Sequence, residues 1–146
     1  MTFIRDLKIG HKYELEALKY LDYDTYIQAD VTKCIKEYDL VITKDKISTK
    51  IEIKADFRAK TTGNIAIEYS CNKKKSGIAT TEAEYWIIFI IYDSENVCYK
   101  IPIKDLKMLC KNNCLRASGG DGCRSRLFLI PIYKCKKYII NKKTIL

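Results

Sequence analysis

The sequence lacks the features that mark membrane-spanning, secreted and multidomain proteins. Its longest apolar run, residues 86–92, is far shorter than the roughly 20 residues that a helix needs to cross a bilayer. Arg5, Asp6 and Lys8 interrupt the N-terminal stretch, which therefore does not have the pattern of a signal peptide. Only two prolines occur among 146 residues, and we find no proline-rich linker, repeat or low-complexity block. These absences predict one soluble, intracellular domain over residues 1–146, without a membrane partner.

The sequence also offers little to soft metal ions or to disulfide bonds. Its one histidine, His11, is expected on a helix surface. The seven cysteines are odd in number and follow no secretory signal, which argues against a disulfide framework. No C-x2-C pair is present, so a zinc site would need Cys110, Cys114, Cys123 and Cys135. Free thiols that pack as small apolar side chains are the alternative, and the sequence leaves both open.

Acidic residues are scarce relative to basic ones, with 27 Lys and Arg against 18 Asp and Glu and a formal net charge of +9. This balance favours a polyanionic partner, without separating DNA from RNA or anionic lipid. The candidate nucleic-acid-binding segment contains Lys73, Lys74 and Lys75, followed by the hydroxyls of Thr80 and Thr81. A run of charge is equally typical of an ordinary solvated surface.

Two neighbouring apolar segments carry charged side chains at matching positions. Residues 39–43 and 50–55 have the pattern of strands, and Asp45-Lys46 is the natural centre of a turn between them. Because side chains alternate along a strand, Glu52 and Lys54 share a face. A two- or four-residue turn pairs Thr43 with Ser48, Val41 with Lys50, and Asp39 with Glu52, and paired residues face the same side. Asp39, Glu52 and Lys54 are therefore expected to converge on one patch.

This patch has a definite chemistry if it forms. Two carboxylates held close together repel each other unless a cation or a proton neutralises them. Oxygen ligands favour Mg²⁺, which keeps several waters and takes few protein carboxylates. Lys54 beside such an ion would orient a water or stabilise a phosphate. The alternative is the solvated face of an amphipathic hairpin with a cross-strand ion pair.

The pattern resembles the signature of the PD-(D/E)xK nuclease superfamily, in which an acid is followed by Glu-x-Lys on the next strand. Here Tyr38-Asp39 replaces the Pro-Asp pair, and Glu52-Ile53-Lys54 follows. The segment from Gly10 to Leu21, which contains Glu14, is similar to the opening of archaeal Holliday-junction resolvases. Similarity to small phage and large-DNA-virus members extends over residues 62–69, 76–86, 119–121 and 127–131.

The resemblance covers most of residues 10 to 132 and implies a role for each matched residue. Asp39 and Glu52 would bind Mg²⁺, for which Mn²⁺ would substitute, and Lys54 would be the catalytic lysine. Glu14 would be an auxiliary acid near the metal, and Glu68 is a further candidate ligand. The implied activity is metal-dependent endonucleolytic hydrolysis of phosphodiester bonds in DNA. Branched or junction DNA, a homodimer, and the cytoplasm or the nucleus of an infected host cell are the suggested context.

The apolar pattern predicts an α/β domain. A helix is expected over residues 12–21, with Leu15, Leu18 and Leu21 facing inward. The other expected elements are strands over residues 25–29, 39–43, 50–55, 64–70, 86–92 and 127–132, and a helix over 104–110. Such an order suits the αβββαβ-type, restriction-endonuclease-like core that the superfamily implies, with a mixed central sheet flanked by helices.

Three local features add detail to this expectation. Thr80 or Thr81 would cap a short helix, with Glu84 as the capping-box partner of Thr81. Pro131 predicts that the last strand lies at an edge of the sheet, because proline cannot donate to a ladder. The glycines of residues 119–122 allow a close backbone approach, either to a phosphate or around a plain turn.

Two rival functions stay open. A catalytically inactive nucleic-acid-binding module of the same fold would bind DNA in a salt-sensitive manner without binding a metal ion. An interaction protein, whose charge only confers solubility, would show no salt-dependent binding to any nucleic acid. The presence of both acids together with Lys54 favours the nuclease.

Overall fold

The structure, a computed structural model, describes residues 2–29, 38–112, 115–119, 122 and 124–141. One sheet in this part of the chain has five strands: β1 (Thr25–Gln28), β2 (Leu40–Lys44), β3 (Ile47–Asp56), β6 (Tyr85–Ile91) and β7 (Asn96–Pro102). They lie in the order β1-β2-β3-β6-β7, and β3 and β6 are parallel whereas the other neighbours are antiparallel. The sheet is therefore mixed, as predicted.

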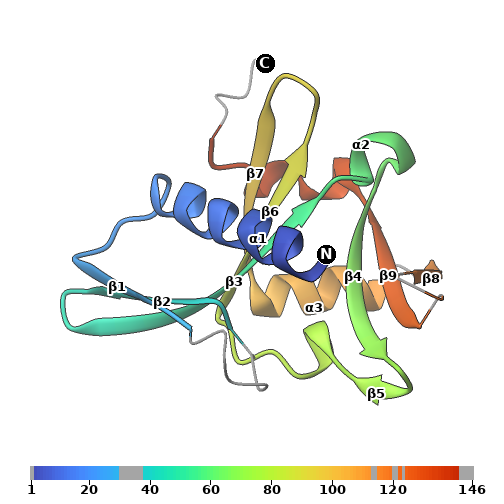
Figure 1. Cartoon of the computed structure of the whole chain (residues 1–146), viewed down its shortest axis with the longest axis horizontal. Coiled ribbons are helices and arrows are strands. Elements are labelled where there is room, and N and C mark those ends of the chain that lie inside the picture. Colours follow the sequence, from blue (N-terminus) through green and yellow to red (C-terminus); the bar gives the residue numbers. More distant parts are fainter. Residues whose placement is uncertain (1, 30–37, 113–114, 120–121, 123, 142–146) are drawn as a thin grey trace.

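A second sheet has the order β5-β4-β9-β8, and all of its pairs are antiparallel. Its strands are β4 (Asn64–Cys71), β5 (Lys74–Lys75), β8 (Arg116–Gly119) and β9 (Ser125–Pro131). The helices are α1 (Thr2–Leu18), α2 (Ala59–Thr62) and α3 (Ile103–Asn112), with the short 3₁₀ segments η1 (Gly77–Ala79) and η3 (Ile132–Tyr138). Figure 1 shows α1 and α3 on either side of the central strands. None of the described helices is long and apolar enough to cross a membrane.

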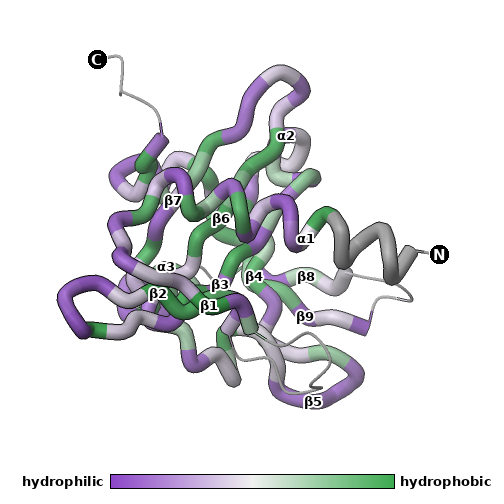
Figure 2. The backbone as a smooth tube through the Cα atoms, turned by 60° about the vertical axis from the view of Figure 1, so that its left-hand side comes forward, coloured by the Kyte–Doolittle hydropathy of each residue, from purple (hydrophilic) through white to green (hydrophobic). Residues whose placement is uncertain are grey.

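The two faces of the five-stranded sheet pack against different partners. On one face, apolar side chains of β2, β3 and β6 pack with Tyr13, Ala17 and Leu18 of α1. On the other face, alternate residues of β6 beginning with Trp86 and Ile88 pack with α3 and the second sheet. Because β6 is buried on both faces, its sequence is a continuous apolar run. Figure 2 shows this contrast between a hydrophobic β6 and hydrophilic stretches at the β2–β3 turn and around β5.

The hairpin of β2 and β3 forms as the sequence predicts. Asp45 and Lys46 have φ values of 49° and 67°, the left-handed backbone of a two-residue hairpin turn. The turn pairs Thr43 with Ser48 and Val41 with Lys50, as expected. The ladder begins at the pair of Leu40 and Ile51, one residue short of the predicted pairing between Asp39 and Glu52. The register therefore keeps Glu52 and Lys54 on the face that α1 does not cover.

The segment over residues 64–70 is a strand, but its predicted place as the third strand of the core is wrong. It forms β4 and pairs with β9 in the second sheet, while β6 takes the position beside β3. Because β3 and β6 are parallel, the intervening chain must cross over the sheet, which usually takes a helix. Here the crossover contains only the short α2 and η1, with β4 and β5 between them. The structure thus has a mixed five-stranded sheet flanked by helices, with β4 outside that sheet.

Two helix predictions fail locally. The inward prediction for Leu15 is wrong because its side chain is 50% exposed, while Tyr13, Ala17 and Leu18 form the buried face of α1. The helix that Thr80 or Thr81 was expected to cap is absent from the described chain, which contains only η1 at this point. Thr81 instead accepts hydrogen bonds at Oγ1 from Ala83 N at 3.2 Å and from Trp86 Nε1 at 3.1 Å. Its hydroxyl therefore satisfies a buried indole rather than a helix end.

Two strands differ from expectation for simple reasons. β9 lies between β4 and β8, so the prediction of an edge strand is wrong. Pro131 is the last residue of β9 and therefore does not interrupt its ladder. β7 was not predicted, and its burial gives no strict alternation, because the consecutive residues Val97, Cys98 and Tyr99 are all buried. It lies at the end of the five-stranded sheet beside β6.

Candidate active site

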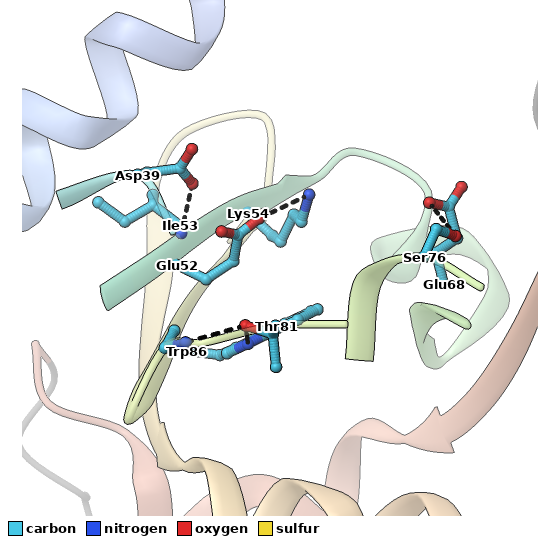
Figure 3. A network of polar contacts seen from close by, with 9 residues as sticks. Asp39, Glu52, Ile53, Lys54, Glu68, Ser76, Thr81 and Trp86 are labelled. Atoms are coloured by element: carbon cyan, nitrogen blue, oxygen red, sulfur yellow. Dashed lines mark hydrogen bonds and ion pairs between the residues drawn. The ribbon is translucent and has the colours of Figure 1, made fainter. Parts of the chain in front are cut away.

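Glu52 and Lys54 form an ion pair on the face of β3 that points away from α1. Lys54 Nζ lies 3.1 Å from Glu52 Oε1. The Glu52 side chain is 13% exposed, and that of Lys54 is 49% exposed. Ile51 and Ile53 alternate with them and are buried against α1. The expectation that Glu52 and Lys54 share a face is confirmed, and Figure 3 shows their side chains joined.

Asp39 is fixed at the edge of β3, between these two residues. Its Oδ2 accepts a hydrogen bond of 2.9 Å from the backbone N–H of Ile53. Its own backbone N–H donates to the carbonyl oxygen of Ile51, also at 2.9 Å. Because Ile53 separates Glu52 from Lys54, the bond holds the Asp39 carboxylate beside the main chain that carries the ion pair (Figure 3). Asp39 is therefore held beside the β3 backbone between Glu52 and Lys54, although it has no partner in the β2–β3 ladder.

The charge environment keeps Lys54 protonated. Partial burial acts to lower the pKa of Lys54, but the negative charges of Glu52, Asp39 and Glu68 outweigh it, and the pKa is raised above its ordinary value of 10.5. A lysine in this state remains a cation at neutral pH. Electrostatic stabilisation of a phosphate therefore suits Lys54 better than proton abstraction from a water.

This shift predicts how stability depends on pH. The pKa of Lys54 is higher in the folded chain than the ordinary 10.5, so the pairing stabilises the fold fully below pH 10.5 and is lost as the pH rises through the folded-state value. We expect the difference in the free energy of unfolding between the wild type and Lys54→Met to be constant from neutral pH to about pH 10 and to shrink above that. Denaturant unfolding at a series of pH values measures this difference, in which the titrations of other groups cancel. If the difference in the free energy of unfolding grew above about pH 10, the raised pKa of Lys54 in the folded chain would be contradicted.

Glu68, the further candidate acid, is held by two serine hydroxyls. Ser76 Oγ donates to Glu68 Oε2 at 3.0 Å, and Ser125 Oγ donates to Oε1 at 2.6 Å. Gly77 makes the approach of Ser76 possible, because its φ is +53° and a Cβ there would lie 2.2 Å from the carbonyl oxygen of Glu68. Both carboxylate oxygens of Glu68 are thus engaged. It acts as an oriented negative charge that faces the Lys54 side chain (Figure 3).

A cavity of about 390 Å³ opens beside Lys54. Its lining combines acidic, basic and aromatic side chains: Lys54, Asp56, Phe57, Arg58, Glu68 and Trp86 contribute, with apolar residues of β4, β6 and β9. Lys54 Nζ lies 5.9 Å from the centre of the Trp86 ring. Glu52 and Asp39 are not among the lining residues, so the cavity reaches the ion pair only at Lys54.

Sequence reasoning missed Arg58 and Asp56 at this cavity. Asp56 is structural, since Oδ1 accepts from the backbone N–H groups of Arg58 and Ala59 and Oδ2 accepts from Ala66 N. These bonds fix the start of α2 and orient the chain that carries Arg58. The signal was present for Asp56, which follows Lys54 at a spacing of two within β3, whereas Arg58 lies past the end of the strand at the start of α2.

The donor set suits magnesium better than zinc. Mg²⁺ takes one or two carboxylates and completes its shell with water and phosphate oxygens, and Asp39 and Glu52 supply that number. No group of three or more His, Cys, Asp and Glu side chains that could hold a metal ion exists among the residues that the structure describes. Cys110 and Cys135 are buried, and burial raises their pKa to about 12 and about 11, so both are neutral thiols.

Glu14, the predicted auxiliary acid, lies on α1 rather than on the strands that carry the ion pair. Glu14 is 7% exposed on α1, where Oε2 accepts from Gln28 Nε2 at 2.9 Å and lies 3.4 Å from Nδ1 of His11. Gln28 pairs with Leu40, and Leu40 lies on the α1 face, so Glu14 lies on the side of the sheet opposite Glu52. The described residues do not include four that the sequence analysis named, which are Cys114, Gly120, Asp121 and Cys123.

The lysine cluster forms the exposed turn from β4 into β5. Lys73, Lys74 and Lys75 are exposed, and Lys73 has a φ of 65°. The cluster is linked to the cavity because Ser76, which follows Lys75, binds Glu68. Thr80 is exposed, whereas Thr81 is engaged with Trp86. The three lysines themselves are not among the residues that line the cavity.

Comparisons of the chain with protein-family models, with curated proteins and with solved structures find no match. The site is therefore interpreted from its own geometry and charge.

Proposed function

We propose that this protein is a metal-dependent endonuclease that hydrolyses phosphodiester bonds in DNA and belongs to the PD-(D/E)xK superfamily. One observation carries the proposal: the Lys54–Glu52 ion pair of 3.1 Å lies beside a carboxylate, Asp39, that is anchored to the residue between them. Two acids beside a lysine that is protonated at neutral pH and lines an open cavity are what a phosphodiester hydrolase needs. The mixed sheet and the order α1, β1, β2, β3, crossover, β6 support a restriction-endonuclease-like core.

Each residue has a defined task in this proposal. Asp39 and Glu52 hold the Mg²⁺ ion, and Mn²⁺ substitutes for it. When bound, the ion supplies polarisation of the phosphate and a lowered pKa of a coordinated water. Lys54 offsets the negative charge that develops on the phosphate oxygens during attack. Arg58, on the cavity wall, donates to a neighbouring phosphate group and fixes the register of the strand.

The choice of DNA rests on charge and resemblance. The net charge of +9 favours a polyanion, and the exposed side chains of Lys73, Lys74 and Lys75 add local positive charge that a DNA backbone would attract. Similarity of the segment around Glu14 to junction resolvases suggests branched DNA and a homodimer that places two sites on one junction. Specificity within such folds varies widely, so the substrate is a matter for direct assay.

The test is incubation of the purified protein with linear duplex, supercoiled, single-stranded and four-way-junction DNA, and with an RNA strand. Each is assayed in Mg²⁺, in Mn²⁺ and in chelator. We expect cleavage of at least one DNA form with either metal ion and none in chelator. Cleavage that continues in chelator, or that is confined to RNA, would contradict the proposal.

One observation favours a second candidate, a catalytically inactive nucleic-acid-binding module of the same fold. Glu52 already has a cationic partner in Lys54, so its charge is balanced within the chain. Calorimetric titration with Mg²⁺ separates the candidates. Absence of metal binding together with DNA affinity that falls steeply with salt would favour the module, while metal binding in the presence of DNA would favour the nuclease.

A further inference from the structure

A second and larger cavity, of about 630 Å³, lies between α3 and the second sheet. It shares no lining residue with the cavity beside Lys54. Its lining consists of an apolar and aromatic floor with three cations: Tyr69, Ile78, Ala79, Cys110 and Phe128, and Lys107, Lys111 and Arg116. Its volume is within the range of about 300 to 1,000 Å³ that small-molecule sites occupy.

Three flat groups are stacked at this cavity. The rings of Tyr69 and Phe128 have centroids 4.4 Å apart with an interplanar angle of 34°. The Arg116 guanidinium carbon lies 5.7 Å from the Tyr69 centroid and 5.3 Å from the Phe128 centroid. Both rings are half-buried, so part of their surface remains available. A face made of two rings and a guanidinium favours another flat ring over an aliphatic chain.

The cations around this face are not neutralised within the described chain. Lys107 and Lys111 are four residues apart on α3 and therefore lie on the same side of the helix. Arg116 approaches from β8, and all three side chains are exposed. No ion pair joins any of them to an acid among the residues that the structure describes. Three positive charges grouped in this way attract an anion with several oxygens.

We propose that this cavity binds a nucleotide, with the base stacked against Tyr69 and Phe128 and the phosphate held by Lys107, Lys111 and Arg116. Each half of the site selects one half of that ligand. A nucleoside would use only the rings, and an aliphatic carboxylate would use only the cations. The nucleotide is either a free monophosphate or one unit of a single strand. The site does not depend on the nuclease proposal, because none of its residues lines the Lys54 cavity.

Calorimetric titrations in chelator test the site with four probes: deoxyadenosine monophosphate, deoxyadenosine, decanoate and a short oligodeoxyadenylate. We expect the monophosphate to bind at least about tenfold more tightly than deoxyadenosine or decanoate, because each of these lacks one set of contacts. An oligonucleotide that binds more tightly than the monophosphate identifies a strand unit as the ligand, and equal or weaker binding identifies the free nucleotide. Equal affinity for the monophosphate and decanoate, or no binding of the monophosphate, would overturn the proposal.

Variants locate the binding on the molecule. Arg116→Gln and Lys107→Gln are exposed changes, each expected to weaken monophosphate binding by about tenfold or more. Tyr69→Leu, which keeps an apolar side chain, is expected to weaken it by a similar factor through lost stacking. Lys46→Gln is the matched control on the exposed β2–β3 turn, outside both cavities, and should leave affinity unchanged. The titrations measure binding in chelator, where metal-dependent cleavage does not proceed, so failure of the nuclease proposal is distinguishable from failure of this one. Unchanged affinity in both Arg116→Gln and Lys107→Gln would contradict the assigned site.

Discussion

Replacing Lys54 with methionine is expected to lower the rate of DNA cleavage in Mg²⁺ by about a hundredfold to a thousandfold, the usual effect of removing one preorganised electrostatic contact in an active site. The ammonium group lies 3.1 Å from Glu52, and the charges of Glu52, Asp39 and Glu68 raise its pKa and keep it protonated. Methionine has a similar length and no charge, so it fills the space beside Trp86 without the cation. Single-turnover rates on whichever DNA form the wild type cuts measure the effect.

Two further variants separate the charge of Lys54 from its position. Lys54→Arg keeps the cation and should retain more activity than Lys54→Met. Lys46→Met removes an equal charge from the exposed β2–β3 turn, to which no binding role is assigned, and we expect it to cut at a rate close to the wild type. If Lys54→Met cut as fast as the wild type while remaining folded by circular dichroism, Lys54 would have no role in the reaction.

Replacing Asp39 with asparagine is expected to remove Mg²⁺-dependent cleavage while leaving the fold nearly unchanged. The asparagine oxygen can still accept the 2.9 Å hydrogen bond from Ile53 N, so only the negative charge is lost. Loss of one unit charge beside a divalent ion should weaken Mg²⁺ binding by at least about tenfold. Calorimetric titration with Mg²⁺ and cleavage assays over a range of Mg²⁺ concentrations measure the two effects.

Asp39→Ala provides the contrast. It removes the acceptor as well as the charge and leaves the backbone N–H of buried Ile53 without its partner. We expect a loss of about 1 to 3 kcal/mol in the free energy of unfolding for Asp39→Ala, against a much smaller change for Asp39→Asn. Equal destabilisation by the two variants would mean that the Asp39 charge stabilises the fold and is not reserved for a ligand.

The hairpin was predictable because its signals are local. Asp45 and Lys46 are flanked by alternating apolar residues, and a two-residue turn there leaves one register in which Ile51 and Ile53 face the core. That register fixes the side of the sheet on which Glu52 and Lys54 lie. The buried β6 was equally clear from its continuous apolar run. The placement of Glu52 and Lys54 on one face therefore followed from periodicity alone, whereas the anchoring of Asp39 did not.

The partners of these strands were decided by tertiary packing. β4 has the alternation of a core strand, but its inward residues Ile65 and Ile67 pack in the cluster that also contains Ile130 of β9. A period of two says that a segment is a strand and says nothing about which strand lies beside it. Thr81 likewise has the sequence context of a helix cap, and the buried Trp86 indole competes for its hydroxyl.

The nucleotide cavity had no signature that sequence reasoning recognised. Its lining side chains come from four separate elements, and only the packing of α3 on the second sheet brings them together. They are Tyr69 of β4, Lys107 of α3, Arg116 of β8 and Phe128 of β9.

By itself, the sequence determined the β2–β3 hairpin, the side of β3 that carries Glu52 and Lys54, the buried β6 and the excess of positive charge. These depend on turn chemistry, alternation and composition, which act between residues close in the chain. The tertiary structure alone decided the neighbour of β3, the anchoring of Asp39 to Ile53, the serine contacts of Glu68 and both cavities. These depend on contacts between segments far apart in sequence, whose choice is set by competition for buried surface across the whole chain.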